Sequence, residues 1–365
     1  MKVGSAKQRL PVHDNLAVRV NRLADPGALP ADTFRYEAIP LPELSAGEVL
    51  VEALCQTIDA GSRAMLEPST DYVFKLSPGS RVPASATLGR IVRSRDPRHP
   101  EGTLVRSLRG VRQRYLAMNP DTTLGFAAIR PGTDPFAWIG VLGMTGFTAW
   151  LGITDICRPE PGQTLVVSAA AGAVGSAAGQ FGRLRGARVV GIAGGSDKCD
   201  WVVRELGFAA CVDYRATDFP AALAAACPAG IDAYFENVGG AVQQAVFPLM
   251  NDFGRIAMCG QVAQYSGAGE QPGPNLMVVV LRRLELKGFL ASDHFGRLDA
   301  FLEQAGAWAA AGQLVQPVSI SAGAQALHEA INMLAQGRNC GQQVHQWCSD
   351  AELAAAFSGA GFSPR

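Results

Sequence analysis

The residues best suited to chemistry form a run of small side chains directly after an apolar segment. The run, residues 169–176, reads Ala-Ala-Ala-Gly-Ala-Val-Gly-Ser and follows the apolar residues 164–168. The pattern Gly-x-Gly-x-x-Gly is filled at its three glycine positions by Ala170, Gly172 and Gly175. In a strand–turn–helix context such a run lets the backbone approach a pyrophosphate, whose charge the helix start stabilises. The run therefore predicts a dinucleotide site, with a purely structural turn as the alternative.

The end of the next predicted strand, residues 188–192, indicates which dinucleotide would bind. An NAD site would carry an acidic residue there, about 20 residues after the glycines, to bind the ribose hydroxyls. The chain instead reads Ala-Gly-Gly-Ser-Asp-Lys over residues 193–198. Ser196 and Lys198 could bind a 2′-phosphate, with Tyr214 arriving from the following strand. We therefore expect NADP(H), although Lys198 could also be a solvated lysine in the first turn of a helix.

Other catalytic constellations are missing from the sequence. Cys55 is the one cysteine in a plausible early position for a catalytic zinc ligand, but no Gly-His-Glu follows it. None of the five histidines stands at metal-ligand spacing to a cysteine, and no four-cysteine site occurs. No Gly-x-Ser-x-Gly nucleophile elbow is present either. We therefore expect no metal site and no serine-hydrolase chemistry.

Composition narrows the class of protein further. The 365 residues contain 32 basic and 32 acidic side chains, so the net charge is zero and nothing favours binding to nucleic acid or to an anionic membrane. Hydrophobic residues make up 48% of the chain, enough for a large core, and no apolar stretch reaches the ~18 residues of a membrane span. The N-terminus has no apolar segment typical of a secretory signal. We expect a cytoplasmic protein whose eight cysteines are reduced and mostly serve packing.

The elements that must position these residues change in character along the chain. Residues 1–135 are rich in proline and in short alternating runs, which predicts β-structure, and residues 136–153 indicate a helical linker. Strands and helices then alternate. Strands are predicted at 164–168, 188–192, 211–213, 231–235 and 254–259, and helices at 174–184, 198–206 and 219–226. Such alternation predicts an α/β fold with a parallel sheet.

A set of motifs in fixed order resembles the zinc-independent medium-chain dehydrogenases/reductases, and within them the prostaglandin reductase (leukotriene B4 dehydrogenase)/alkenal double-bond reductase group. The resemblance is dense from about residue 138 to 345 and thinner over the first 130 residues. Besides the glycine run, it is carried by residues 143–150 (Gly-Met-Thr-Gly-Phe-Thr-Ala-Trp), 194–199 (Gly-Gly-Ser-Asp-Lys-Cys), 236–240 (Glu-Asn-Val-Gly-Gly), 259–260 (Cys-Gly) and 337–339 (Gly-Arg-Asn).

The resemblance implies a GroES-like β-rich domain over residues 1–137 and a Rossmann NADP-binding domain over 138–318, with residues 319–365 returning to the first domain. It also implies hydride transfer from NADPH to the double bond of an α,β-unsaturated ketone or aldehyde, and a homodimer formed through the cofactor domain. The apolar residues 277–281 could belong to that interface or to the core. A zinc-free carbonyl or quinone reductase, an alcohol oxidoreductase and a non-catalytic NADP-binding module are the alternatives.

The same resemblance assigns roles residue by residue. The implied cofactor contacts are Ala170, Gly172, Ala173, Val174, Gly175, Gly195, Ser196, Lys198, Tyr214, Asn237, Cys259, Gly260, Met144, Thr145 and Asn339. Tyr265 matches the tyrosine of the family's active-site motif and is the candidate donor to the substrate oxygen, with a pocket wall or core position as the alternative. The pair Asp293-His294 is a weaker candidate acid, and Asn237 could simply fix a turn.

The chain departs from the family in the predicted substrate domain. Residues 59–65 read Asp-Ala-Gly-Ser-Arg-Ala-Met where the family usually has Asp-Pro-Tyr-Met-Arg, and residues 110–113 read Gly-Val-Arg-Gln. These changes leave the substrate less certain than the cofactor. Lys75, Arg63 and Arg112 could contact a substrate carboxylate, but we expect them on solvated faces.

Overall fold

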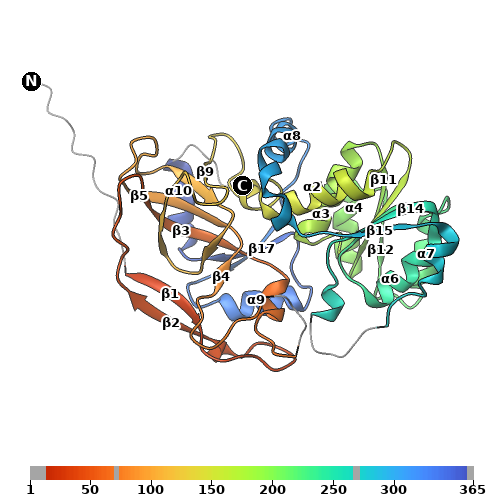
Figure 1. The fold of residues 1–365 in the computed structure, drawn as a ribbon, viewed down its shortest axis with the longest axis horizontal. Coiled ribbons are helices and arrows are strands. Elements are labelled where there is room, and N and C mark those ends of the chain that lie inside the picture. Colours follow the sequence, from red (N-terminus) through yellow and green to blue (C-terminus); the bar gives the residue numbers. More distant parts are fainter. Residues whose placement is uncertain (1–13, 70–73, 266–271, 360–365) are drawn as a thin grey trace, which may run out of the picture.

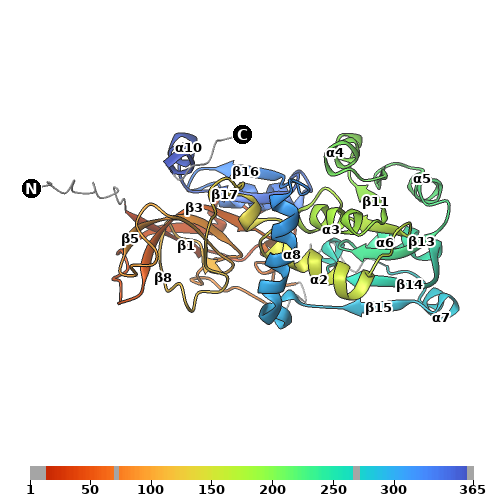
Figure 2. The ribbon, with the colours of Figure 1, turned by 90° about the horizontal axis from the view of Figure 1, so that it is seen from above.

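The computed structural model describes residues 14–69, 74–265 and 272–359, and it shows two lobes side by side (Figure 1). One lobe is β-rich and contains the start of the chain, and the other alternates strands and helices. The helix α8 (Leu298–Ala310) lies between them in both views (Figures 1 and 2). Within the described residues no helix is both long and apolar enough to cross a membrane.

The α/β lobe is built on a parallel sheet in which every described strand pairs in parallel with its neighbour. In spatial order its six described strands are β12 (Ala210–Asp213), β11 (Arg188–Ala193), β10 (Thr164–Ser168), β13 (Ile231–Glu236), β14 (Met250–Met258) and β15 (Glu285–Gly288). The chain runs outward from β10 in one direction and then in the other. That order is the doubly wound Rossmann arrangement, and its ligand crevice lies where the direction reverses, at the ends of β10 and β13.

Two hydrophobic clusters cover the two faces of this sheet. Leu165 and Val167 of β10 point into one cluster and Val166 into the other, because successive side chains of a strand alternate. The first cluster packs against α2 (Met144–Leu151), α3 (Ala173–Leu184), α4 (Ser196–Leu206) and α8. The second packs against α5 (Phe219–Ala226), α6 (Gly240–Val246) and α7 (Met277–Arg282). Burial on both faces explains why the strands read as continuous apolar runs.

The β-rich lobe is a mixed sheet that the end of the chain completes. Its described strands follow the order β16 (Val318–Ala322), β17 (Gln342–Gln346), β3 (Val49–Ile58), β5 (Thr87–Ser94), β6 (Leu104–Ser107) and β9 (Ala127–Ala128), while β8 (Tyr115–Met118) pairs with β3. The antiparallel pairing of β17 with β3 brings residues near 345 beside residues near 56. This pairing fits a return of the chain to the first lobe, whereas the exact boundaries at 137 and 318 stay a prediction.

Smaller elements fill the remainder of the described chain. They are β1 (Asn15–Val20) paired with β2 (Phe34–Ile39), β4 (Pro83–Ala84) paired with β7 (Gly110–Val111), and the helices α1 (Gly61–Ala64), α9 (Leu327–Ala335) and α10 (Asp350–Gly359). Short 3₁₀ segments occur at Ala31–Thr33, Ala137–Ile139, Phe247–Leu249, Val262–Gln264 and Ala291–Arg297, and a π-helical turn, Gly152–Cys157, continues α2.

The expectation that Arg63 and Arg112 are solvated is wrong, since both are buried in the β-rich lobe. Arg63 forms a buried ion pair with Glu67 and donates to the backbone carbonyl of Gly27. Arg112 donates from Nη2 to the carbonyl oxygen of Thr57 at 2.6 Å, and burial lowers the pKa of its guanidinium to about 10. Long cationic side chains enter a core only where such partners meet them.

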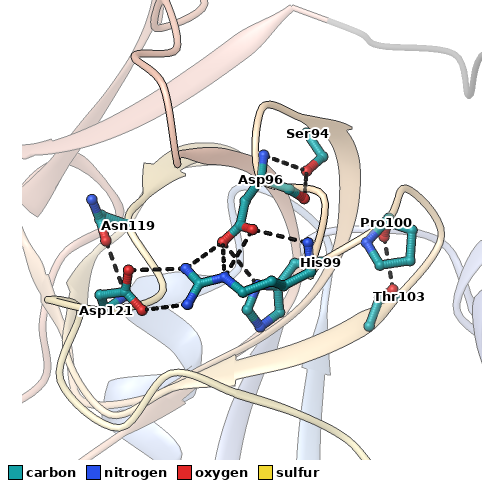
Figure 3. A network of polar contacts seen from close by, with 8 residues as sticks. Ser94, Asp96, His99, Pro100, Thr103, Asn119 and Asp121 are labelled. Atoms are coloured by element: carbon teal, nitrogen blue, oxygen red, sulfur yellow. Dashed lines mark hydrogen bonds and ion pairs between the residues drawn. The ribbon is translucent and has the colours of Figure 1, made fainter.

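A polar network ties the β5–β6 hairpin to the segment after β8 (Figure 3). The buried carboxylate of Asp96 accepts bonds from Arg98 and His99, and the Arg98 guanidinium also forms two bonds to Asp121, at 3.0 and 2.9 Å. The bonds from Arg98 hold the pKa of the Asp96 carboxyl well below its usual range. This network belongs to a rim of the β-rich lobe, and none of its residues appears among the predicted site residues.

Candidate active site

The turn after β10 has the geometry that a dinucleotide requires. Ala169 adopts a φ of +49°, which turns the chain sharply, and Gly172 is the N-cap of α3. A Cβ on Gly175 would lie 2.2 Å from the carbonyl oxygen of Ala169, so only glycine permits this closeness of helix and turn. Ala170, the position of the missing first glycine, is fully buried and donates its N–H to Ile192.

The start of α3 fits an anionic group. No side chain caps this helix, whose first residues are Ala173 and Val174, so the backbone N–H groups of its first turn lack a side-chain acceptor. Gly172 has an extended backbone with φ of −84° and carries no side chain that would hold a ligand away from these groups. The helix dipole adds a favourable interaction with negative charge at the same end. These features suit the pyrophosphate of a dinucleotide.

The predicted 2′-phosphate residues meet where β11 and β12 end. Gly195, with φ of +96°, begins α4 and donates its N–H to Oδ1 of Asp213 at 2.9 Å, which brings Ser196 close to the end of β12. Lys198 lies in the same first turn, and its Nζ donates to the backbone carbonyls of Gly337 and Asn339 at 2.6 and 2.5 Å. Burial lowers the pKa of this lysine; Cys340 opposes the effect, and repulsion from Arg215 adds to it. Lys198 is therefore held in place before any phosphate arrives.

A second cation at this end escaped the sequence prediction. Arg215 follows the half-exposed Tyr214, and its guanidinium lies 5.6 Å from the centroid of that ring. A Cβ on Gly194 would lie 2.9 Å from Arg215 Nε and 2.8 Å from the Tyr214 ring, so both side chains cover the turn before α4. The sequence signal was available, since a basic residue directly follows the predicted tyrosine, but its position over the turn depends on the fold.

The C-terminal segment of the chain closes the site from the side of the β-rich lobe. Gly341 forms a bridge with Gly172 and donates its N–H to Ala171 at 2.7 Å, so this segment touches the glycine turn directly. Asn339 is buried, and its side-chain amide donates to the carbonyl of Gly341 at 2.9 Å. This contact holds Asn339 next to the segment that touches the glycine turn, and its role at the nicotinamide stays a prediction.

Met144 and Thr145 begin α2 at the boundary between the two lobes. The Thr145 hydroxyl lies 3.1 Å from the carbonyl of Gly140 and 3.2 Å from Oε1 of Gln342, and the amide of Gln342 donates to the carbonyl of Ile58. Gln342, which sequence reasoning missed, therefore links the start of α2 to the end of β3. Met144 packs, partly buried, against the cluster formed by α2, α3 and α8.

Asn237 and its neighbours form a tightly bonded corner at the end of β13. The Asn237 backbone N–H donates to the Ser168 hydroxyl and its side-chain amide donates to the Ser168 carbonyl, each at 2.8 Å. The fully buried carboxylate of Glu236 accepts from the Ser168 hydroxyl at 3.0 Å and from the N–H of Val238 at 2.6 Å. These contacts of Asn237 favour the turn-fixing role. Glu236 and Ser168, also missed, are the residues that hold this corner.

Tyr265 lies at a cavity of about 520 Å³ together with the predicted residues Cys259 and Gly260. Other residues that line it are Met258, Gln261, Leu290 and Asp293. The Tyr265 hydroxyl lies 3.3 Å from where a Cβ of Gly260 would be, so this glycine makes room for it. Burial raises the pKa of the tyrosine, a hydrogen bond from the Gln261 backbone opposes this effect, and Cys259 adds to it, so the hydroxyl is protonated at neutral pH.

The thiol of Cys259 is also held in its neutral form. Burial raises its pKa to about 12, with a further contribution from the negative charge of Glu236. Asp293 is exposed at the cavity wall, and His294 beside it is half-buried within a kinked 3₁₀ segment. Thus the cavity unites Tyr265 with one member of the weaker candidate pair. In the described residues no group of three or more His, Cys, Asp or Glu could hold a metal ion.

Comparison with known protein families identifies both lobes. The family model described as zinc-binding dehydrogenase matches residues 173–308, and the model described as N-terminal domain of oxidoreductase matches residues 22–124. The chain is 37% identical to NADPH-dependent curcumin reductase of Escherichia coli, over 89% of this chain and 94% of that protein. The chain belongs to the zinc-independent medium-chain dehydrogenase/reductase family.

Further relatives support this assignment. The chain is 35% identical to 2-alkenal reductase (NADP(+)-dependent) of Nicotiana tabacum, over 84% of this chain and 89% of that protein. It is 34% identical to prostaglandin reductase 1 of Mus musculus, over 85% of this chain and 93% of that protein. The solved structure of CurA from Vibrio vulnificus in complex with NADPH superposes with a TM-score of 0.82 at 32% identity, covering 92% of this chain and 99% of that one. The predicted fold, a Rossmann domain with a GroES-like domain, is confirmed.

Proposed function

We propose that this protein reduces the carbon–carbon double bond of α,β-unsaturated ketones and aldehydes. The protein is an NADP-dependent oxidoreductase and its cofactor is NADP(H). The observation that carries the finer proposal is the cavity lined by Cys259, Gly260 and Tyr265, which places a tyrosine hydroxyl of raised pKa at its wall. The names of the relatives, which include an alkenal reductase and a curcumin reductase, point to the same class of substrate.

The residues of the chain suggest how the cofactor would be held. The N–H groups at the start of α3, opened by Gly172, would bind the pyrophosphate, and Lys198, Ser196 and Tyr214 would bind the 2′-phosphate with help from Arg215. Met144, Thr145 and Asn339 would position the nicotinamide end. When bound, the cofactor supplies the hydride that the β-carbon of the substrate receives.

Tyr265 would stabilise the negative charge that develops on the substrate oxygen during reduction. Because its pKa is raised, the hydroxyl donates a hydrogen bond and gives up its proton less readily than an exposed tyrosine. We therefore assign Tyr265 the role of a hydrogen-bond donor to the oxygen. The proton for the α-carbon then comes from solvent or from another group at the cavity wall.

The neutral Cys259 would protect the enzyme from its own substrate. An α,β-unsaturated carbonyl reacts with thiolates, and Cys259 lines the proposed substrate cavity. Its pKa of about 12 leaves almost no thiolate at neutral pH. Because the thiolate is the nucleophilic form, Cys259 should react slowly with such a substrate. A thiol in this position is therefore compatible with an electrophilic substrate.

The predicted homodimer is part of the proposal. The strand β15 is the last described strand at one edge of the parallel sheet, and α7 beside it exposes Met277, Val280 and Leu281, each by more than half. Within the same segment Val278 and Val279 are partly buried against the second hydrophobic cluster, so α7 turns one side to the core and leaves the other exposed. An open strand edge next to an apolar helix suits pairing with a second copy. The cytoplasmic location stays a prediction.

The proposal is tested by incubating the protein with NADPH and an acyclic enone, and by identifying the product by mass spectrometry and NMR. A saturated ketone is the expected product. An allylic alcohol would show instead that the carbonyl group is reduced. Loss of NADPH with a quinone, but with no enone or enal, would also contradict the proposal.

A further inference from the structure

Two cysteine thiols face one another beneath the turn that carries the proposed 2′-phosphate contacts. Cys199 lies in the first turn of α4 and Cys211 lies on β12, and their Sγ atoms are 3.1 Å apart, with the Cys211 thiol donating toward Cys199. A disulfide bond measures about 2.05 Å, so an approach of roughly 1 Å would join them. Neither thiol has a part in the proposed reaction.

A glycine on the neighbouring strand accommodates the sulfur of Cys211. Gly191 lies opposite Cys211 on the neighbouring strand, and a Cβ there would come within 3.2 Å of the Cys211 sulfur. Glycine at this position therefore lets the Cys211 sulfur pack closely against β11. Cys199 is 7% exposed and Cys211 is half-buried, and β12 is the outermost described strand at its edge of the sheet. The pair therefore lies close to the surface.

The two thiols differ in acidity in the way that a reactive pair requires. The hydrogen bond from Cys211 lowers the pKa of Cys199, although burial and the carboxylates of Asp213 and Asp200 oppose this effect. Donation of its proton, followed by burial, raises the pKa of Cys211. Cys199 is thus the nucleophile of the pair, and Cys211 is the thiol that resolves it. By contrast, burial raises the pKa of Cys227, on the opposite side of the sheet, to about 11.

Both cysteines are directly connected to the proposed phosphate contacts. Cys199 follows Lys198 in sequence and donates its N–H to the carbonyl of Gly195. Cys211 lies two residues before Asp213, whose carboxylate accepts the N–H groups of Gly195 and Arg215, each at 2.9 Å. Drawing α4 toward β12 would therefore displace the cations that are to meet the phosphate.

We propose that Cys199 and Cys211 form a reversible disulfide when the protein meets hydrogen peroxide, and that this disulfide weakens NADPH binding. The Cys199 thiolate attacks the peroxide oxygen and becomes a sulfenic acid, releasing hydroxide. The Cys211 thiol then attacks that sulfur, the S–O bond breaks, and water leaves as the disulfide forms. Overall, two thiols are oxidised and one peroxide is reduced to two molecules of water. The link to NADPH rests on the proposed position of the 2′-phosphate.

The disulfide can be detected directly in the full-length protein. Cleavage by trypsin after Lys198, Arg204 and Arg215 places the two cysteines in separate peptides, Cys199–Arg204 and Glu205–Arg215. We expect hydrogen peroxide to produce the linked pair of these peptides, and dithiothreitol to remove it. Reciprocity of binding predicts that saturating NADP⁺ disfavours the disulfide at equilibrium. Loss of thiols to peroxide without this linked pair would overturn the proposal.

Kinetics test the consequence for the cofactor. We expect oxidation to raise KM for NADPH by about tenfold, the effect of weakening one charge-assisted contact, with little change in kcat. Cys211→Ala should abolish this response, and Cys227→Ala, a matched buried cysteine, should retain it. A linked peptide with an unchanged KM would overturn the regulatory part. A wrong placement of the 2′-phosphate can be told apart from a wrong disulfide proposal. In that case the Lys198→Ala variant, kept reduced, would show an unchanged KM for NADPH.

Discussion

The same substitution, glycine to alanine, should affect stability at one glycine of the turn after β10 and NADPH affinity at another. In Gly175→Ala the new Cβ would lie 2.2 Å from the Ala169 carbonyl oxygen and 2.8 Å from its carbonyl carbon, which are backbone atoms that cannot move independently. In Gly172→Ala the Cβ would lie 3.1 Å from the same oxygen, and the φ of −84° is normal for alanine. The protein itself thus tolerates alanine at 172 far better than at 175.

The expected magnitudes follow from these contacts. Overpacking in Gly175→Ala should cost about 1–3 kcal/mol of unfolding free energy, which lowers Tm by about 3–10 °C for a domain of this size. Gly172→Ala should change stability by about 1 kcal/mol or less, but its methyl group would face the proposed pyrophosphate. Loss of one charge-assisted N–H bond, worth about 1.5–3 kcal/mol, should raise the Kd for NADPH by about tenfold to a hundredfold.

Differential scanning calorimetry without cofactor gives the stabilities, and isothermal titration with NADPH gives the affinities. Gly175→Ala should have a clearly lower Tm than the wild type. Gly172→Ala should unfold near the wild-type temperature but bind NADPH more weakly. Wild-type affinity in a folded Gly172→Ala variant would refute the placement of the pyrophosphate at α3. A wild-type Tm in Gly175→Ala would refute the packing argument.

Four further outcomes are expected. Lys198→Ala should raise KM for NADPH much more than for NADH, because NADH lacks the 2′-phosphate that the lysine would bind, and equal effects would contradict that role. Tyr265→Phe should lower kcat by roughly tenfold or more while leaving the Kd for NADPH unchanged in titrations. Burial lowers the pKa of His345 to about 3, whereas an unfolded chain protonates this residue near pH ~6.5. The free energy of unfolding should therefore fall as the pH drops from ~6.5 toward 3, by up to about 1.4 kcal/mol per pH unit. In denaturation experiments at a series of pH values, His345→Gln should show a weaker dependence of this free energy on pH. Val280→Asp on α7 should shift the protein from dimer to monomer in analytical ultracentrifugation, and a monomeric wild type would contradict the dimer.

The cofactor lobe could be predicted from sequence because its signals are local. Residues 164–168 form an apolar run, Gly172 and Gly175 follow at a fixed spacing, and the helix begins where the pattern places it. The strand at residues 254–259 was predicted too short, since β14 begins at Met250. Its first residues carry little apolar pattern and pair in an irregular register with β13.

Contacts between distant segments could not be predicted in the same way. Gln342 meets Thr145 across 197 positions of sequence, and no local pattern marks a glutamine for that role. Arg112 is buried because its guanidinium donates a hydrogen bond to the carbonyl of Thr57 within the folded sheet. From sequence alone an arginine is expected to be solvated, because most arginines are exposed. The approach of Cys199 to Cys211 likewise depends on how α4 packs on β12.

Hydride transfer from NADPH deuterated at C4 tests the central claim most directly. If the protein reduces the carbon–carbon double bond, NMR of the product from an unlabelled enone should show deuterium on the β-carbon of a saturated ketone. Deuterium on the carbon of a newly formed alcohol would contradict the account, because the hydride would then have reached the carbonyl group.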